Sequence, residues 1–398
     1  MKVGAKRWTV LIGLIAARVA LGFHLQVLAV VGPGVSADLA LTNTELGLLI
    51  GIFLAPGIVL ALPGGALIQR LGEKSVIALS LLLMTVAAIV AAHGAGFWAM
   101  FFARILGGAG GVMITVSAAK TVVDWFHGRE INSALAANLT GFPIGVAIAL
   151  FGLGGFAEPE TWRNAFWIAA AAGVGALLVF ILTFDAPEKA GSVRGLGVLG
   201  ALPNRSEAVL IVLIGGVWAI YNGSFMIMLS FTPLFLAAEG IPFERAAFLV
   251  GLAPMCSLFA VPLGGLIADR LHRPNIIIVA GAAMWGLAMA LLVPFARWPV
   301  AVGVLLVAGA LAGAPPSGPI VATAGGVARP RARGAALGLF YTVFYLGSVV
   351  TPPVAGWAID ASGSPATGMM MMPVLLLLAI AVFAVFLRKR TLLTGAKT

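Results

Sequence analysis

Twelve apolar runs, each long enough to cross a lipid bilayer as a helix, dominate this chain. A helix needs about 20 apolar residues to cross the hydrocarbon layer, whereas the strands of a membrane β-barrel leave alternating segments of about 10 residues. The runs lie at 8–31, 46–68, 75–93, 97–119, 131–155, 164–184, 208–237, 246–268, 275–295, 299–325, 334–358 and 369–387. We therefore expect an all-α integral membrane protein with twelve transmembrane helices.

Composition excludes most soluble classes of protein. The chain is 61% hydrophobic and 10% charged, while soluble proteins have about 25% charged residues. No nucleophile–base–acid set is visible, so we expect no enzyme activity and no cofactor. The methionine run 369–372 has no Cys or His beside it, so we expect a helix start there and no metal site.

Lysine and arginine lie mainly on one side of the expected membrane. If the N-terminus is cytoplasmic, the cytoplasmic segments carry eighteen of the 24 basic residues, and the opposite face carries Arg163, Arg245 and Arg297. The eighteen are Lys2, Lys6, Arg7, Arg70, Lys74, Arg129, Lys189, Arg194, Arg205, Arg270, Arg273, Arg329, Arg331, Arg333, Arg388, Lys389, Arg390 and Lys397. This bias predicts an inner-membrane protein with both termini in the cytoplasm. It also explains the net charge of +10 without a nucleic-acid partner.

A repeat divides the chain into two halves. The stretch 64–74, GGALIQRLGEK, returns two hundred residues later at 264–273 as GGLIADRLHR. We expect a six-helix bundle at 1–184, a cytoplasmic linker at 185–207 and a second six-helix bundle at 208–398. Two such halves allow alternating access, in which one half rocks against the other around a central site.

The layout and the repeated loop resemble the major facilitator superfamily. The resemblance implies the fold of that family and a cytoplasmic latch in which the loop Asp faces a helix of the other half. Gln69 replaces that Asp in the first copy and His272 replaces a Gly in the second, so we expect Asp269→Asn to perturb conformational exchange more than Gln69→Ala. The matching residues are Gly65, Arg70, Gly72 and Lys74, then Gly265, Asp269, Arg270 and Arg273, with Arg104 and Gly108 matching a motif of the fourth span.

Two arginines lie inside apolar runs, Arg18 in the first and Arg104 in the fourth. Intramembrane charges are costly and usually face a cavity or a partner, and no Asp or Glu falls in the middle of a run. We therefore expect the negative charge to arrive with the substrate, which the planar guanidinium fork would bind. A structural role is open for Arg104, whose side chain could instead bind backbone carbonyls and steady spans 1 and 4.

Other polar residues inside the runs are candidates for the site. Gln26 shares the first span with Arg18, and His24 could couple transport to protons or could simply be hydrogen-bonded. In the second half, cavity lining and helix packing both remain open for the polar side chains of spans 7 and 11. These substrate candidates are Tyr221, Asn222, Tyr341 and Tyr345.

Together these patterns predict a transporter of a small anion, a carboxylate or an oxyanion, that works by rocking alternating access. Uniport, anion exchange and proton-linked symport all fit. Two alternatives stay open: a drug or metabolite efflux transporter of the same fold, and a membrane sensor or scaffold without transport. The expected partners are the small molecule and the lipid bilayer, and we expect a monomer.

Overall fold

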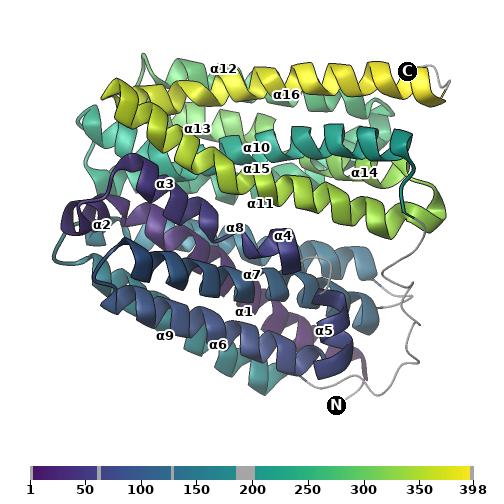
Figure 1. Cartoon of the computed structure of the whole chain (residues 1–398), viewed down its shortest axis with the longest axis horizontal. Helices are drawn as coiled ribbons and strands as arrows, with labels where there is room; N and C mark the ends of the chain where they lie inside the picture. Colours follow the sequence, from purple (N-terminus) through teal and green to yellow (C-terminus); the bar gives the residue numbers. More distant parts are fainter. Residues whose placement is uncertain (1–2, 61–63, 127–129, 185–201, 395–398) are drawn as a thin grey trace. The chain divides into compact units, whose positions relative to one another are not determined.

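The computed structural model describes residues 3–60, 64–126, 130–184 and 202–394, and all regular elements in these ranges are helices (Figure 1). The first half contains α1 (Val3–Val30), α2 (Gly32–Leu39), α3 (Asn43–Ile52), α4 (Pro56–Leu60), α5 (Gly64–Leu71), α6 (Glu73–His93), α7 (Phe97–Phe126), α8 (Ile131–Gly152), the 3-10 turn Gly154–Phe156 and α9 (Trp162–Thr183). The second half contains α10 (Arg205–Ala238), α11 (Phe243–Leu271), α12 (Pro274–Leu292), α13 (Pro299–Gly313), α14 (Ser317–Val327), the 3-10 turn Pro330–Ala332, α15 (Arg333–Ser362) and α16 (Pro365–Thr394).

Among the residues that the structure describes, twelve helical segments are long and apolar enough to cross a membrane, which confirms the predicted number of spans. The chain divides into two compact units, Met1–Val193 and Arg194–Thr398. Most of the predicted linker, residues 185–201, lies outside the described residues. The linker's last residues belong to α10, which begins at Arg205.

Capping boxes set the starts of two spans. Thr42 accepts a hydrogen bond from the backbone N–H of Glu45, whose side chain binds back to Thr42, so α3 begins at residue 43. Asn204 and Glu207 form the same box at the start of α10. Such a box satisfies backbone donors that would otherwise be exposed, and it starts each helix three residues before the apolar run alone predicts.

Proline breaks two spans and lies inside continuous helices in others. Pro56 follows the irregular segment 53–55 in the second span, and Pro315 and Pro316 separate α13 from α14 in the tenth. Pro352 and Pro353, by contrast, lie inside the continuous helix α15, so they do not break the eleventh span. A proline removes one backbone donor, and in a membrane neighbouring groups can satisfy the freed carbonyls.

In the first unit, glycines let α1 and α8 cross at backbone contact. A Cβ at Gly145 would overlap the carbonyl oxygen of Val19, and one at Gly22 would overlap that of Phe142. Lipid supplies no hydrophobic driving force between helices. Small residues at such a crossing allow the close van der Waals packing that stabilises it instead. The glycine-rich segment of span 5 is therefore a packing surface for α1.

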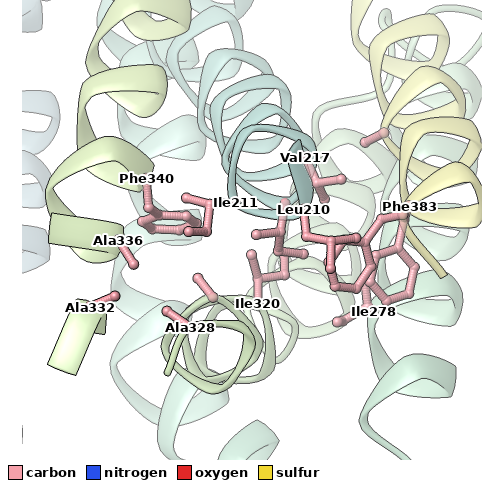
Figure 2. Packing of buried hydrophobic residues seen from close by; sticks show 14 residues of the cluster. Leu210, Ile211, Val217, Ile278, Ile320, Ala328, Ala332, Ala336, Phe340 and Phe383 are labelled. Atoms are coloured by element: carbon pink, nitrogen blue, oxygen red, sulfur yellow. The ribbon is translucent and has the colours of Figure 1, made fainter. Parts of the chain in front are cut away.

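In the second unit, a hydrophobic cluster gathers residues from α10, α12, α14, α15 and α16. Figure 2 shows Ile278 and Phe383 on one side of Leu210, while Ala336 and Phe340 lie on the other. These side chains are almost completely buried. The cluster joins the beginnings of α10, α12 and α15 to the ends of α14 and α16.

Each copy of the repeated loop has a residue with positive φ at the same aligned position. Gly72 has φ of 80° before α6, and His272 has φ of 52° after α11. A left-handed backbone suits glycine and is costly for most other residues. The position at which His272 departs from the motif therefore keeps the conformation that favours glycine.

Candidate functional site

Arg104 lies in the first third of α7, and its guanidinium is held by backbone carbonyls of the first unit. Nη1 donates to the carbonyl of His24 at 2.9 Å, and Nη2 donates to that of Leu25 at 3.0 Å. Nε donates to the carbonyl of Leu49 at 3.1 Å. The side chain is 4% exposed, so these bonds replace water around the buried charge.

The break in the second span supplies the rest of this arrangement, which we call the Arg104 clamp: Arg104 with His24, Leu25, Leu49 and Phe53. The guanidinium carbon lies 4.3 Å from the centre of the Phe53 ring, a cation–π distance. The carbonyl of Leu49 lies near the end of α3, just before the irregular segment. Sequence analysis missed Leu49 and Phe53, although Pro56 signalled a break beside them.

His24 is 4% exposed and faces α9. Its ring hydrogen-bonds to the backbone of Ala169, and Nε2 has no hydrogen-bond partner among the described residues. Its own carbonyl binds the Arg104 guanidinium. A proton added to this ring would place a second positive charge next to Arg104 in a medium of low dielectric constant.

A small cavity lies beside the Arg104 clamp, inside the first unit. It is lined by side chains from α1, α6, α7 and α9 together with Phe53, and His24 and Arg104 supply its polar edge. Its volume of about 10 Å³ is close to what one water molecule needs. Drug-sized ligands need at least about 300 Å³, so this cavity is not a substrate site.

Arg18 and Gln26, also on α1, are both buried, at 6% and 1% exposed. A Cβ placed on Gly141 of α8 would lie 2.8 Å from the Cβ of Arg18. The side chain of Arg18 therefore leaves α1 on the face that meets α8, while His24 faces α9. The two intramembrane arginines belong to different surroundings: Arg18 begins at the α1–α8 contact, and Arg104 is in the clamp.

In the second unit, Tyr221 of α10 donates its hydroxyl hydrogen to the carbonyl of Gly313. Gly313 is the last residue of α13, and at the following break the Ser317 N–H donates to Ala314 at 3.2 Å. The hydroxyl therefore satisfies a carbonyl at a proline break. The Tyr221 ring lies 5.0 Å from that of Trp285 and is 4% exposed, which is a packing environment.

The other second-unit candidates differ in exposure. The amide of Asn222 donates to the carbonyl of Trp218 in its own helix at 2.9 Å. Tyr345 is buried, with its ring 4.9 Å from Phe344. Tyr341 is 37% exposed, the largest accessible fraction among the three tyrosines.

Carboxylates stay out of the middles of the spans. Every Asp and Glu in the described ranges lies in a terminal turn of a helix or between helices. Several are paired there: Glu73 and Asp124 both accept from Lys120 near the end of α7, and Asp124 does so at 2.7 Å. The four-residue spacing of Lys120 and Asp124 signalled one of these pairs.

The loop-motif residues are described in part. Arg70, Asp269 and Arg270 are exposed at the ends of α5 and α11. A Cβ at Gly265 would meet open space. Gly65 and Gln69 lie on α5, and the side chain of Gln69 is outside the described residues, so the expected asymmetry between the two copies stays a prediction.

Comparison with known proteins adds relatives and structural neighbours. A family model described as Major Facilitator Superfamily matches residues 10–324 and, in a second match, 213–397. The quinolone resistance protein NorA of Staphylococcus aureus is 31% identical over 156 residues, which cover 38% of this chain and 39% of NorA. The probable sulfoacetate transporter SauU of Cupriavidus necator is 26% identical over 295 residues, which cover 67% of this chain and 66% of SauU. The chain thus spans less than two thirds of the length of either relative.

Solved structures of transporters have the same fold. A bacterial homolog of the human lysosomal transporter Spinster superimposes with a TM-score of 0.76 at 18% identity and 99% coverage of both chains. The nucleoside transporter NupG gives a TM-score of 0.74 at 15% identity, with 95% of this chain and 98% of NupG covered.

Proposed function

The chain belongs to the major facilitator superfamily and is a multi-pass membrane transporter, and from this premise we propose that its cargo is a small organic anion, a carboxylate or a sulfonate. The observation that carries the proposal is the charge inside the spans. Arg18 and Arg104 lie there, and the described carboxylates lie at helix ends. An anionic cargo would balance the positive charge on the transport path.

Within this proposal the two arginines have different roles. Arg104 is structural, because its guanidinium donates to three carbonyls and stacks on Phe53. Arg18 holds the anion through its guanidinium fork, a geometry suited to carboxylate and sulfonate oxygens. Gln26 adds an amide on the same helix, and Tyr341 adds the exposed phenol of the second half.

The relative SauU supports this choice of cargo. Its name gives sulfoacetate, a small molecule with both a carboxylate and a sulfonate, and the similarity covers 67% of this chain. We place the protein in the inner membrane with cytoplasmic termini, on the strength of its lysine and arginine distribution. Transport would proceed by alternating access of the two halves.

Proton coupling through His24 is disfavoured in this scheme. The ring is buried, bonded to Ala169 and close to the positive charge of the Arg104 clamp. Protonating it during each cycle would add a charge that no described carboxylate balances. We therefore favour anion exchange or uniport over His24-linked symport.

The test measures uptake of labelled sulfoacetate and of a panel of small carboxylates and sulfonates into proteoliposomes. We expect saturable uptake by the wild type, a loss of about 100-fold or more in Arg18→Gln and partial retention in Arg18→Lys. Arg245→Gln, which removes an exposed arginine in the first turn of α11, serves as the matched control and should transport normally. Wild-type protein that carries none of the anions, or Arg18→Gln that carries them normally, would contradict the proposal.

A second candidate, drug efflux, is favoured by the 31% identity to NorA. The same proteoliposomes, loaded with a fluorescent quinolone, distinguish the two. Quinolone transport that is unaffected by Arg18→Gln would favour drug efflux and would contradict the proposed anion site at Arg18.

A further inference from the structure

The second unit carries an unusual concentration of positive charge at one end. The basic residues lie at the start of α10, around the α11–α12 and α14–α15 connections and in the last turns of α16, and all have exposed side chains. We call them the basic end. They are Arg205, Arg270, Arg273, Arg329, Arg331, Arg333, Arg388, Lys389 and Arg390.

The hydrophobic cluster of Figure 2 contains near neighbours in sequence of these basic residues, and from this we infer that the basic residues share one end of the bundle. Leu210 lies five residues after Arg205, and Ile278 lies five after Arg273. Ala328 and Ala332 lie within the α14–α15 connection, and Phe386 lies two residues before Arg388. Since these apolar side chains pack together, the basic residues next to them surround one patch.

Few carboxylates accompany this charge. Asp269 is exposed near the end of α11. Glu207 is 7% exposed and is occupied by the capping box and by Arg329, whose Nε lies 2.9 Å from it. The net charge of the patch is therefore strongly positive.

The equivalent end of the first unit is different. There Arg7 pairs with Glu130 at 2.8 Å, and Lys120 pairs with both Glu73 and Asp124. A general bias of lysine and arginine toward one side of a membrane applies to both units. The excess of unbalanced charge on the second unit needs a separate explanation.

Exposed apolar side chains next to the charges indicate what kind of partner fits. Leu271 is 58% exposed between Arg270 and Arg273, and Leu392 is 72% exposed just after the basic turn of α16. A patch that binds a soluble acidic protein or nucleic acid would not need leucines of this exposure. Basic and apolar groups side by side match the boundary between phospholipid headgroups and acyl chains.

We propose that the basic end binds acidic phospholipids, with the arginines on the phosphodiester and the leucines against the acyl chains. Basic clusters next to a membrane span attract acidic lipids, and arginine binds phosphate oxygens with two parallel hydrogen bonds. The inference requires a bundle that spans a bilayer and does not depend on the cargo. Lipid binding and transport are measured separately, so the lipid proposal and the proposed cargo can be contradicted independently of each other.

The test titrates full-length protein in a neutral detergent with phosphatidylglycerol or phosphatidylcholine and follows thermal unfolding and bound lipid by native mass spectrometry. We expect phosphatidylglycerol to bind preferentially. The double variant Arg331→Gln/Arg388→Gln should weaken its binding by about 30-fold, from the known contribution per basic residue. Lys6→Gln/Lys74→Gln, which removes two charges from the first unit, should keep the preference.

Three results would overturn the proposal. They are the absence of a preference in wild-type protein, an equal loss in both double variants, and an equal thermal shift from glycerol phosphate or polyglutamate, which would identify a soluble anion as the ligand. If the second-unit variant does not fold, the salt dependence of phosphatidylglycerol binding by wild-type protein tests the proposal instead. The preference should fall steeply between low and high ionic strength, and a preference unaffected by salt contradicts the proposal.

Discussion

Nη1 of Arg104 lies 2.9 Å from the carbonyl oxygen of His24, and this bond ties the first third of α7 to α1. Two further bonds, to Leu25 and Leu49, extend the tie around α1 and to the end of α3. A buried guanidinium that donates to carbonyls is solvated by the protein itself. The position of Arg104 inside a span is therefore explained by packing of the first unit.

We expect Arg104→Lys to lower stability by about 2–4 kcal/mol, because one ammonium cannot reproduce three planar donors. The thermal midpoint in detergent measures this loss. Protein that remains folded should bind cargo with nearly wild-type affinity. Arg18→Gln should cause a large loss of cargo binding in protein that remains folded. A large loss of cargo affinity in folded Arg104→Lys would indicate that Arg104 belongs to the binding site.

The hydrogen bond between Tyr221 and Gly313 gives a second prediction. Tyr221→Phe leaves a carbonyl at the α13–α14 break without this donor, so we expect a loss of about 1 kcal/mol in stability. Cargo affinity should be unchanged, since the ring packs against Trp285. Tyr341→Phe is the matched variant in α15, and we expect it to weaken cargo binding.

The sequence predicts most of the fold, because each span requires about twenty apolar residues and each loop interrupts them. The helix starts at Asn43 and Arg205 were also predictable from the Thr42–Glu45 and Asn204–Glu207 patterns. The continuity of α15 through Pro352 was not predictable from the sequence, because neighbouring groups decide whether a proline breaks a membrane helix. Local pattern thus predicts the elements, and tertiary context decides their kinks.

The candidate site was less predictable. A polar residue inside a span signals a partner, but sequence does not say whether that partner is cargo or protein. Arg104 and Tyr221 both bind backbone carbonyls, which every residue carries and which leave no pattern in a sequence. The hydrogen-bond geometry of the structure assigns Arg104 and Tyr221 to packing, which the sequence alone does not show.

The α1–α8 crossing predicts a contrast between two glycines of the first unit. A Cβ at Gly145 would overlap a backbone oxygen of α1, and one at Gly175 in α9 would meet open space. We expect Gly145→Ala to cost more than about 3 kcal/mol, because two backbones must move apart. Gly175→Ala should be neutral or stabilise by about 0.5–1 kcal/mol, since alanine favours the helix. Equal thermal midpoints for the two variants would contradict the close crossing.

Asp38 gives a prediction about pH. Arg163 Nη1 lies 2.6 Å from its carboxylate and Trp162 Nε1 lies 3.1 Å away, which ties α2 to the first turn of α9. These hydrogen bonds lower the pKa of Asp38 below its ordinary value of 3.8. A carboxyl with a lower pKa in the folded state stabilises the protein fully above the unfolded-state pKa. This stabilisation disappears as the pH falls through the folded-state pKa.

Asp38→Asn should therefore lower the thermal midpoint at neutral pH, and the difference from wild type should shrink once the pH falls below about 4. Melting curves from pH 7 to pH 3 in detergent measure this convergence. Glu160→Gln, which changes an exposed carboxylate on the loop before α9, is the control and should follow wild type throughout. A difference between Asp38→Asn and wild type that stays constant down to pH 3 would mean that Asp38 stabilises the fold without its charge.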